Sequence, residues 1–323
     1  MNHSHLLAGL AIVAAAGGVA AQDYPNKSVI MVVPFAAGGP TDTVARIIAQ
    51  PMSKALKQQV IIENTAGAGG TLASARVAKA APDGYTLLLH HIGHATSATL
   101  YRKLPFDTIN DFEPIGQVAD IPMSLIGKKD LPANNLKELI VWMKANKEKV
   151  LLGNAGIGAA SHLCGMLIQS ALQTEFTTLP YKGTGPAMND LLGGQFDIMC
   201  DQTTSTTGQI KGGRVKAYGV TTLKRVASLP DVPTLNEAGL PGFEVVVWQG
   251  IYAPKGTPKP VIDKLVAALD EALRDPGVKT RLAELGSEPV PPAKATPEGL
   301  RSHLQAEVAK WAPIIKKAAA YAD

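Results

Sequence analysis

A glycine loop at the start of a predicted helix carries the clearest chemical signal in this sequence. The loop Pro34 to Asp42 follows Val29 to Val33, a β-branched run typical of a buried strand, and Thr41 or Asp42 can cap the helical pattern of Val44 to Leu56. Glycine lets the backbone turn with its amides unobstructed, and a helix start carries unpaired N–H groups with partial positive charge. Since the loop has no lysine, it is not a P-loop, and it predicts a seat for an anion such as a carboxylate. The candidate residues of this seat are Phe35, Ala37, Gly38, Gly39, Pro40, Thr41 and Asp42.

A second glycine loop, Gly153 to His162, has the same character. We expect its helix start, with the Ser161 hydroxyl and the His162 imidazole, to face an anion. Gly156, Gly158 and Ser161 nearly match the dinucleotide fingerprint G-x-G-x-x-G/A, so a nucleotide site is one alternative. However, Ser161 replaces the third glycine, and no acidic residue ends the next strand, where a ribose would be held. We therefore predict no cofactor.

The pair Ser161-His162 also allows a second class of function, a secreted α/β hydrolase. Ala159 and Leu163 occupy the positions where the nucleophile elbow G-x-S-x-G needs glycine. Neighbouring residues at a helix start point in different directions, so this serine and this histidine cannot form the nucleophile–base hydrogen bond locally. A distant residue such as His94 would complete a triad only if the fold brought it close. A binding protein without catalytic residues is therefore the main prediction.

Three histidines and one aspartate lie at the ends of predicted strands. His90, His91 and His94 suggest a metal, but they lack a metal-binding spacing such as H-E-x-x-H, so we predict no metal site. His94, in the segment 93–97, is still a candidate donor to a ligand. Asp201 comes directly after a strand, at the edge where open α/β sheets bind ligands. It either accepts a hydrogen bond from a ligand or caps the threonines that follow it.

The N-terminus and the composition indicate an exported protein. Residues 1–21 combine an apolar, alanine-rich run with a small-residue cleavage site at Ala21, as in a signal peptide, although no lysine or arginine precedes the run. The 323 residues carry a net charge of +4 without a basic block, which argues against nucleic-acid binding. In an oxidising compartment Cys164 and Cys200 permit one disulfide. Two buried thiols are the alternative, because the sequence does not give their separation.

Strand and helix patterns alternate along the mature chain, which predicts an α/β fold with parallel sheets and covering helices. Roughly 300 residues exceed the size at which a single core usually splits, so we expect two lobes. The extended segment 113–127 and the proline-rich segment 229–242 predict two crossings between them, as in a hinged clamp. The expected division is a signal peptide at 1–21, a first lobe of 22–120 plus 245–323, and a second lobe of 121–244.

Short motifs spread over the whole chain resemble those of one family. In order they are Tyr24-Pro25; Pro34-Phe-Ala-Ala-Gly-Gly-Pro-Thr-Asp; Glu63-Asn64 with Gly67-Ala-Gly-Gly; Pro82-Asp-Gly-Tyr; Gly153 to His162; Pro180-Tyr-Lys-Gly-Thr-Gly-Pro-Ala; Asp190-Leu-Leu-Gly-Gly-Gln-Phe-Asp; and Ala253-Pro-Lys-Gly-Thr-Pro. Together this ordered set resembles the substrate-binding receptors of tripartite tricarboxylate transporters, also called Bug receptors.

The resemblance implies a two-lobed periplasmic-binding-protein fold, of the Venus flytrap kind and type II-like, without enzymatic activity. It implies a periplasmic monomer that binds a di- or tricarboxylate, an acidic amino acid or an aromatic acid and delivers it to the integral-membrane permease subunits of the transporter. In such receptors backbone amides and waters of the first loop hold a ligand carboxylate. The other positions that the resemblance assigns to the site are Gly69, Gly70, Gly93 and His94 in the first lobe and Ala155, Gly158, Ser161, His162 and Asp201 across the cleft.

Overall fold

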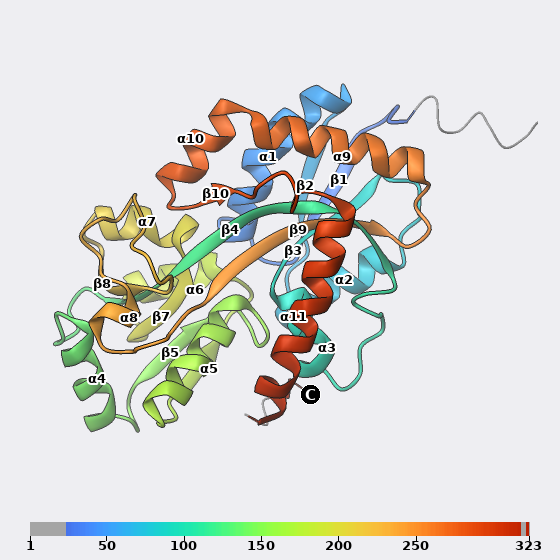
Figure 1. The fold of residues 1–323 in the computed structure, drawn as a ribbon. Coiled ribbons are helices and arrows are strands. Elements are labelled where there is room, and N and C mark those ends of the chain that lie inside the picture. Colours follow the sequence, from blue (N-terminus) through green and yellow to red (C-terminus); the bar gives the residue numbers. More distant parts are fainter. Residues whose placement is uncertain (1–23, 318–320, 323) are drawn as a thin grey trace, which may run out of the picture.

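The computed structural model describes residues 24–317 and 321–322, and the predicted signal peptide lies outside the described residues. Strands and helices alternate as the sequence predicts, and the strands join into one curled sheet of ten strands. The two ends of this sheet belong to two lobes, each with helices packed against its strands (Figure 1). The molecule therefore has the predicted α/β, two-lobed fold.

The first lobe combines the N-terminal third of the chain with its C-terminal helices. Its strands are β1 (Val29–Val33), β2 (Val60–Asn64), β3 (Thr86–His91), β9 (Val246–Pro254) and β10 (Glu288–Pro289). Its helices are α1 (Pro40–Leu56), the 3-10 helix η1 (Ala68–Gly70), α2 (Thr71–Ala78), α3 (Gly93–Leu100), α9 (Lys259–Arg274), α10 (Pro276–Glu284) and α11 (Pro297–Lys317). The apolar run of β1, which pairs in parallel with β2 and β3, is buried because helices cover both faces of the sheet there.

The second lobe repeats the same alternation with its own strands and helices. Its strands are β5 (Leu151–Asn154), β6 (Thr177–Pro180), β7 (Ile198–Gln202) and β8 (Val215–Val220). Its helices are α4 (Leu136–Ala145), α5 (Ala160–Leu172), α6 (Thr184–Leu192), α7 (Thr203–Lys211) and α8 (Leu235–Ala238). Strand β5 pairs in parallel with β6 and β7, so the loops that follow these strands meet at one edge of the sheet.

Two long strands, β9 and β4 (Phe112–Lys128), connect the lobes. The strand order is β2-β1-β3-β9-β4-β7-β5-β6, and β8 and β10 also pair with β4. The first part of β4 pairs with β9 as far as Pro122, and from Met123 onward β4 pairs with β7. One strand therefore carries both lobes, which makes the segment around Pro122 the natural hinge. The division of the chain at 120/121 and 244/245 stays a prediction.

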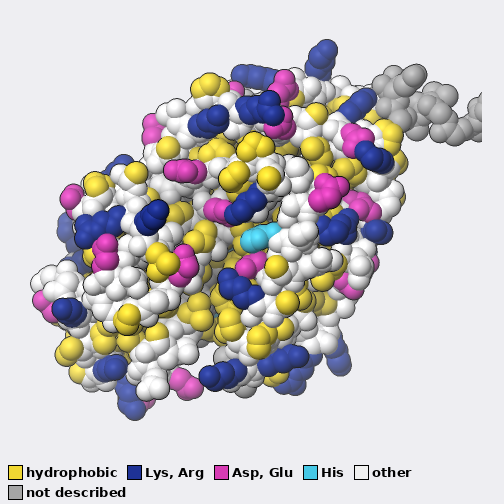
Figure 2. All heavy atoms as spheres, viewed as in Figure 1, with side chains coloured by type: hydrophobic (Ala, Val, Ile, Leu, Met, Phe, Trp, Pro, Cys, Tyr) yellow, Lys and Arg dark blue, Asp and Glu magenta, His cyan; other side chains and the backbone are white. Residues whose placement is uncertain are grey.

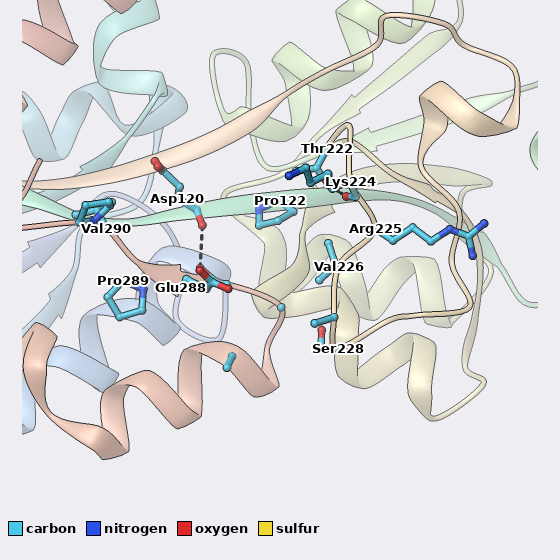
Figure 3. Close-up of a pocket in the computed structure, with 15 residues that line it drawn as sticks. Asp120, Pro122, Thr222, Lys224, Arg225, Val226, Ser228, Glu288, Pro289 and Val290 are labelled. Carbon is cyan, nitrogen blue, oxygen red and sulfur yellow. Dashed lines mark hydrogen bonds between the residues drawn. The ribbon is translucent and has the colours of Figure 1, made fainter.

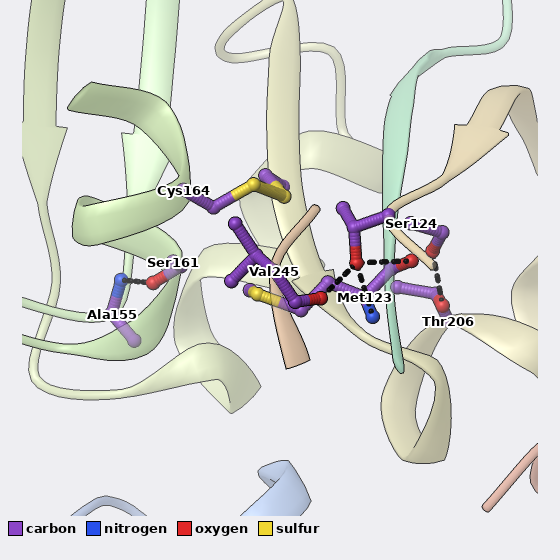
Figure 4. The surroundings of a disulfide bond; sticks show 9 residues. Met123, Ser124, Ala155, Ser161, Cys164, Thr206 and Val245 are labelled. Carbon is purple, nitrogen blue, oxygen red and sulfur yellow. Dashed lines mark hydrogen bonds between the residues drawn. A yellow bond between two sulfur atoms is a disulfide. The ribbon is translucent and has the colours of Figure 1, made fainter. Parts of the chain in front are cut away.

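Cys164 on α5 and Cys200 on β7 form a disulfide in the core of the second lobe (Figure 4). Their Cα atoms are 6.0 Å apart, and both side chains are fully buried. Of the two possibilities that the sequence left open, the structure contains the bridge. It fixes the start of α5, where Ser161 lies, relative to the end of β7, where Asp201 lies.

Two segments at the edge of the sheet are helical. Gly93 and His94 form the first turn of helix α3. The hydroxyl-rich segment after Asp201 is helix α7. Serine and threonine are weak helix formers, but here three of the hydroxyls bond outside the helix: Thr206 with Ser124 at 2.6 Å, and Thr203 and Thr207 with the carbonyl oxygens of Gly286 and Leu285. Over residues 24–317 and 321–322, no helix is both long and apolar enough to cross a membrane.

Candidate functional site

Four helices begin around one small space between the lobes. Helix α1 begins at Pro40 in the first lobe, and α5, α6 and α7 begin at Ala160, Thr184 and Thr203 in the second. In the described chain, none of these four helix starts has a side-chain cap for its free N–H groups. The start of a helix has unpaired donors and the positive end of the helix dipole. The arrangement therefore favours an anion at the point where the four helices meet.

Residues from these helix starts line a small cavity of about 10 Å³, which is room for about one water molecule. This is far below the roughly 300–1,000 Å³ of pockets that hold drug-sized ligands, so the lobes must move apart to admit a ligand. The lining residues are Phe35, Pro40, Thr41, His91, Ala155, Ala159, Ala160, Ser161, Thr184, Asp201 and Gln202. We call this space the inner cavity.

Asp42 holds the first glycine loop in shape. Its buried carboxylate accepts hydrogen bonds from Gly38 N, from Arg46 and from Asn64 Nδ2 at 2.9–3.0 Å. Asn64 Nδ2 also donates to the carbonyl oxygen of Phe35. Burial tends to raise the pKa of Asp42, but the hydrogen bonds from Arg46, Gly38 and Asn64 together hold it below its usual value. Asp42 is therefore a charged, fully paired brace of the loop rather than a wall of the inner cavity.

His91 brings a neutral N–H donor to the inner cavity. Its Nδ1 accepts a hydrogen bond from Gly93 N at 2.8 Å, so the proton of the neutral ring lies on Nε2. Burial lowers the pKa of His91 to about 3, which keeps the ring uncharged near neutral pH. The ring stacks on Phe35 with 4.8 Å between the ring centroids. An uncharged, fixed donor of this kind can bind a carboxylate without a salt bridge.

Among the described residues that line the inner cavity, Asp201 is the only acid. Thr184 Oγ1 donates to its Oδ1 at 3.2 Å, whereas Oδ2 is buried and has no hydrogen-bond partner among the described residues. Burial raises the pKa of Asp201 to about 7, and the hydrogen bonds from Thr184 and from Gln202 N reduce this effect only in part. Since an unpaired buried polar atom is costly, Oδ2 is suited to a hydrogen bond with a bound molecule.

Ser161 and His162 brace the second glycine loop. Ser161 Oγ accepts a hydrogen bond from Ala155 N at 2.8 Å (Figure 4), and His162 Nδ1 accepts one from Gly158 N at 3.3 Å. Burial lowers the pKa of His162 to about 4. Within the described residues, no hydrogen bond joins Ser161 to a histidine. The two side chains therefore lack the nucleophile–base contact on which the alternative hydrolase function depends.

The two lobes touch each other around the inner cavity. Ala36 N donates to the carbonyl oxygen of Lys182 at 3.1 Å. Phe35 packs across the cleft with Ala155 and Ala159 in a small apolar cluster. The structure is therefore a closed arrangement, in which the lobes screen the inner cavity from solvent.

A comparison with protein families decides the identity of this fold. The family described as the tripartite tricarboxylate transporter family receptor (TctC) matches residues 44–320 of this chain. The chain belongs to this receptor family. A relative from Agrobacterium vitis, the UPF0065 protein in the TAR-I ttuE–ttuC′ intergenic region, is 52% identical over 92% of this chain and 86% of its own length.

Solved structures of periplasmic binding proteins share the whole fold of this receptor. BugD is 53% identical, with a TM-score of 0.90 over 92% of this chain and 99% of its own. MatC from Rhodopseudomonas palustris, solved with bound malate, is 42% identical, with a TM-score of 0.88 over 90% and 100%. Rpa4515 from R. palustris, solved with adipate, is 33% identical, with a TM-score of 0.87 over 92% and 99%. These similarities establish the two-lobed fold of a solute receptor.

The predicted site residues of this receptor fall into two groups. Those that line the inner cavity are Phe35, Pro40, Thr41, Ala155, Ser161 and Asp201. Those that do not line it are Ala37, Gly38, Gly39, Asp42, Gly69, Gly70, Gly93, His94, Gly158 and His162. Several residues of the second group lie where the backbones of the two lobes approach each other. A methyl group on Gly93, for example, would lie 2.9 Å from the carbonyl oxygen of Gly158 across the cleft.

His94 lies in the core of the first lobe rather than beside the inner cavity. Helix α3 turns its ring toward Phe112 and Tyr252, with ring centroids 4.8 and 5.0 Å away. Its Nε2 contacts the carbonyl oxygen of Thr108 at 3.1 Å, and its Nδ1 faces Ser74 Oγ at 3.4 Å. Both ring nitrogens of His94 have partners there, and His91, not His94, lines the inner cavity.

Sequence reasoning did not select five residues of the inner cavity. They are His91, Ala159, Ala160, Thr184 and Gln202. A signal for Thr184 was present, because Gly183-Thr184 follows strand β6 and opens helix α6 just as Gly39 and Pro40 open α1. For His91 only a strand position could be predicted, because its place beside the cavity depends on how β3 packs against the second lobe.

A larger groove, of about 400 Å³, lies beside strand β4 (Figure 3). The loop 222–228 forms one wall and the segment 286–291 the other. Two of its charged side chains are paired: Asp120 with Lys294 at 2.8 Å, and Arg225 with Glu237 at 3.0 Å. On the face shown in Figure 2, Lys and Arg side chains are interspersed with Asp and Glu and form no continuous basic surface. The groove therefore lacks the converging donors that distinguish the inner cavity.

Proposed function

We propose that this chain is a periplasmic receptor for a small organic carboxylate, which it delivers to the integral-membrane permease subunits of a tripartite tricarboxylate-type transporter. The observation that carries the proposal is the meeting of four uncapped helix starts in one cavity between the lobes. The receptor acts as a monomer, needs no cofactor and catalyses no reaction. The malate and adipate bound to MatC and Rpa4515 support a carboxylate as the ligand class.

The ligand carboxylate lies at the start of α1 and is held by backbone amides of the first glycine loop. Phe35, Pro40, Thr41, Ala155, Ser161 and Asp201 contact the ligand, and His91 adds an N–H donor. Asp42 shapes this site without touching the ligand. The chain divides into lobes at 22–120 plus 245–323 and at 121–244, and they rotate about the crossing of β4 and β9. Ligand binding shifts the population toward the closed arrangement, because only there do all four helix starts surround one anion.

Calorimetric titration of the mature protein with malate, succinate, aspartate and adipate tests this function. Dimethyl malate is the matched control, because it keeps the carbon skeleton and hydroxyl group but has no negative charge. We expect at least one of the acids to bind and the ester to bind at least about a hundredfold more weakly, since each lost charge-assisted hydrogen bond is worth about 1.5–3 kcal/mol. Equal binding of malate and its ester, or product release from the ester, would contradict the proposal.

A further inference from the structure

We infer that Gly185 sets how closely the two lobes can approach and therefore how small a ligand they can enclose. Gly185 lies in the first turn of α6, directly after Thr184, which lines the inner cavity. A methyl group at this position would lie 2.7 Å from the carbonyl oxygen of Ala37 in the opposite lobe. Ordinary contacts begin at 3.4 Å, so the two lobes would have to separate by several tenths of an ångström. This inference rests on the proposed carboxylate-binding function and names Gly185 as the residue that limits ligand size.

The contact cannot be relieved easily within the second lobe. Helix α6 is anchored by Ala187, Met188 and Leu191, which are buried with Phe196 and Met199 in the core of that lobe. Close-packed side chains of this kind resist displacement. An added methyl group on Gly185 would therefore move α6 as one body with its lobe.

The first lobe is equally rigid at the point of contact. The carbonyl group of Ala37 belongs to the glycine loop, where Asp42 accepts the hydrogen bond from Gly38 N. On the other side of Ala37, Asn64 holds the carbonyl oxygen of Phe35. Because both surfaces are fixed, the hinge at β4 is the element that yields. A wider closing distance then moves Thr184 and Asp201 away from the first loop.

A substitution of Gly185 tests this contact alone, whereas a substitution of the nearby Gly183 does not. A methyl group on Gly183 would also clash, at 2.8 Å from Ala36 N, but Gly183 has a φ of +143°, so any other residue there also strains the backbone. Gly185 lies within a helix, in a conformation that alanine prefers. The substitution Gly185→Ala therefore leaves the isolated lobe intact or more stable and acts on closure alone.

Gly208→Ala is the matched control for this substitution. Gly208 also lies in a helix of the second lobe, α7, and a methyl group there would meet no atom within 4 Å. Both variants exchange a helical glycine for alanine, so both should raise or leave unchanged the melting temperature without ligand. Only Gly185→Ala adds a group between the lobes.

The test is calorimetric titration of the wild-type protein and both variants with malate and adipate. We expect Gly185→Ala to weaken malate binding about tenfold or more, the equivalent of one lost hydrogen bond to a charged group. Adipate binding should weaken less, so that the preference between the two acids moves toward the longer one. Gly208→Ala should bind both acids as the wild type does. Unchanged malate binding by Gly185→Ala, or an equal loss for both acids, would overturn the inference.

A measurement of the lobe separation makes the inference independent of the ligand. Spin labels at the exposed positions Leu72 and Leu192, one on each lobe, report the distance across the cleft by pulsed electron paramagnetic resonance. We expect the shortest distances to disappear in Gly185→Ala and to persist in Gly208→Ala. If the wild type binds none of the acids, the proposed function fails while this distance still decides the role of Gly185. Identical distance distributions in the two variants would overturn that role.

Discussion

Two aspartates flank the site, both almost completely buried, and their surroundings are opposite. Asp42, in the first lobe, accepts hydrogen bonds from a backbone amide, a guanidinium group and a carboxamide, and its pKa lies below the usual value. Asp201, in the second lobe, has one weak side-chain partner and one unpaired oxygen, and its pKa is raised to about 7. The first carboxylate has all of its hydrogen-bonding capacity used by the protein. The second has capacity left for a ligand.

The difference indicates two roles: Asp42 stabilises the loop that forms the site, and Asp201 is available to a bound molecule. A carboxylate whose hydrogen bonds are all made by the protein stabilises the loop around it, and ligand binding does not change these contacts. A buried carboxylate with an unpaired oxygen destabilises the protein without ligand, and a hydrogen bond from a bound molecule removes this cost. The two aspartates therefore respond in opposite directions when their carboxylates are removed, and each prediction below tests this opposition.

The largest effect is expected for Asp42→Ala. The substitution leaves Gly38 N and the Asn64 amide without their acceptor and removes the partner of Arg46, so the free energy of unfolding should fall by about 3–5 kcal/mol. Urea denaturation at pH 7 measures this loss. A loss below about 1 kcal/mol would mean that Asp42 is not the brace of the loop.

The second effect is a gain in stability for Asp201→Asn that depends on pH. Because the folded state holds the proton of Asp201 up to a pKa of about 7, it binds more protons than the unfolded state from about pH 4 to pH 7. The contribution of Asp201 to stability is therefore most favourable at low pH and declines as the pH rises through this window. We expect Asp201→Asn to match the wild type near pH 4 and to be up to about 4 kcal/mol more stable at pH 8.

Thermal and urea unfolding from pH 4 to pH 8 measures this difference. Asp42→Asn is the matched control, because it makes the same chemical change at the paired aspartate and should be less stable than the wild type at pH 8. If Asp201→Asn were destabilised to the same extent as Asp42→Asn, the contrast between the two residues would be refuted.

A smaller effect is expected for Thr184→Val, which removes the hydroxyl that donates to Asp201 Oδ1 and keeps the shape of the side chain. This hydrogen bond favours the ionised carboxylate, so its loss should raise the pKa of Asp201 further. The cost in stability should be about 1 kcal/mol, as for a single hydrogen bond. Carbon-13 NMR of the Asp201 carboxyl group follows the titration. A midpoint that stays in place would show that Thr184 does not influence Asp201.

The smallest effect is expected for Arg46→Ala. Arg46 pairs with Asp42 in a bidentate contact, but its own side chain is 56% exposed, so water replaces much of what it provides. Exposed ion pairs contribute about 0–1 kcal/mol, and Gly38 and Asn64 remain as partners of Asp42. Urea denaturation should show a loss within that range. A loss as large as that of Asp42→Ala would assign the stabilisation of the loop to the ion pair instead.

The contrast between the two aspartates also marks what the sequence could predict. The alternation of strands and helices, the two lobes and the glycine loops follow from local pattern, and the structure confirms them. The family resemblance is confirmed as well by the match over residues 44–320. These features depend on spacing along the chain, which a sequence displays directly.

Features that depend on the packing of distant segments could not be predicted in the same way. The sequence allowed Asp42 to cap a helix and Asp201 to bind a ligand or cap threonines, but it did not show which carboxylate would find partners. His91 and His94 differ by three positions, but His91 ends β3 beside the cavity, whereas His94 lies on α3 and packs in the core. The disulfide likewise required the 6.0 Å separation that only the fold supplies.

A crystal structure of the mature protein with malate tests the central claim most directly. We expect one malate carboxylate between the starts of α1, α5, α6 and α7, with its oxygens about 3 Å from backbone N–H groups, and a malate oxygen at the same distance from Asp201 Oδ2. Asp42 should keep all its partners and touch no ligand atom. Malate in the groove beside β4, or in contact with Asp42 instead of Asp201, would contradict the account.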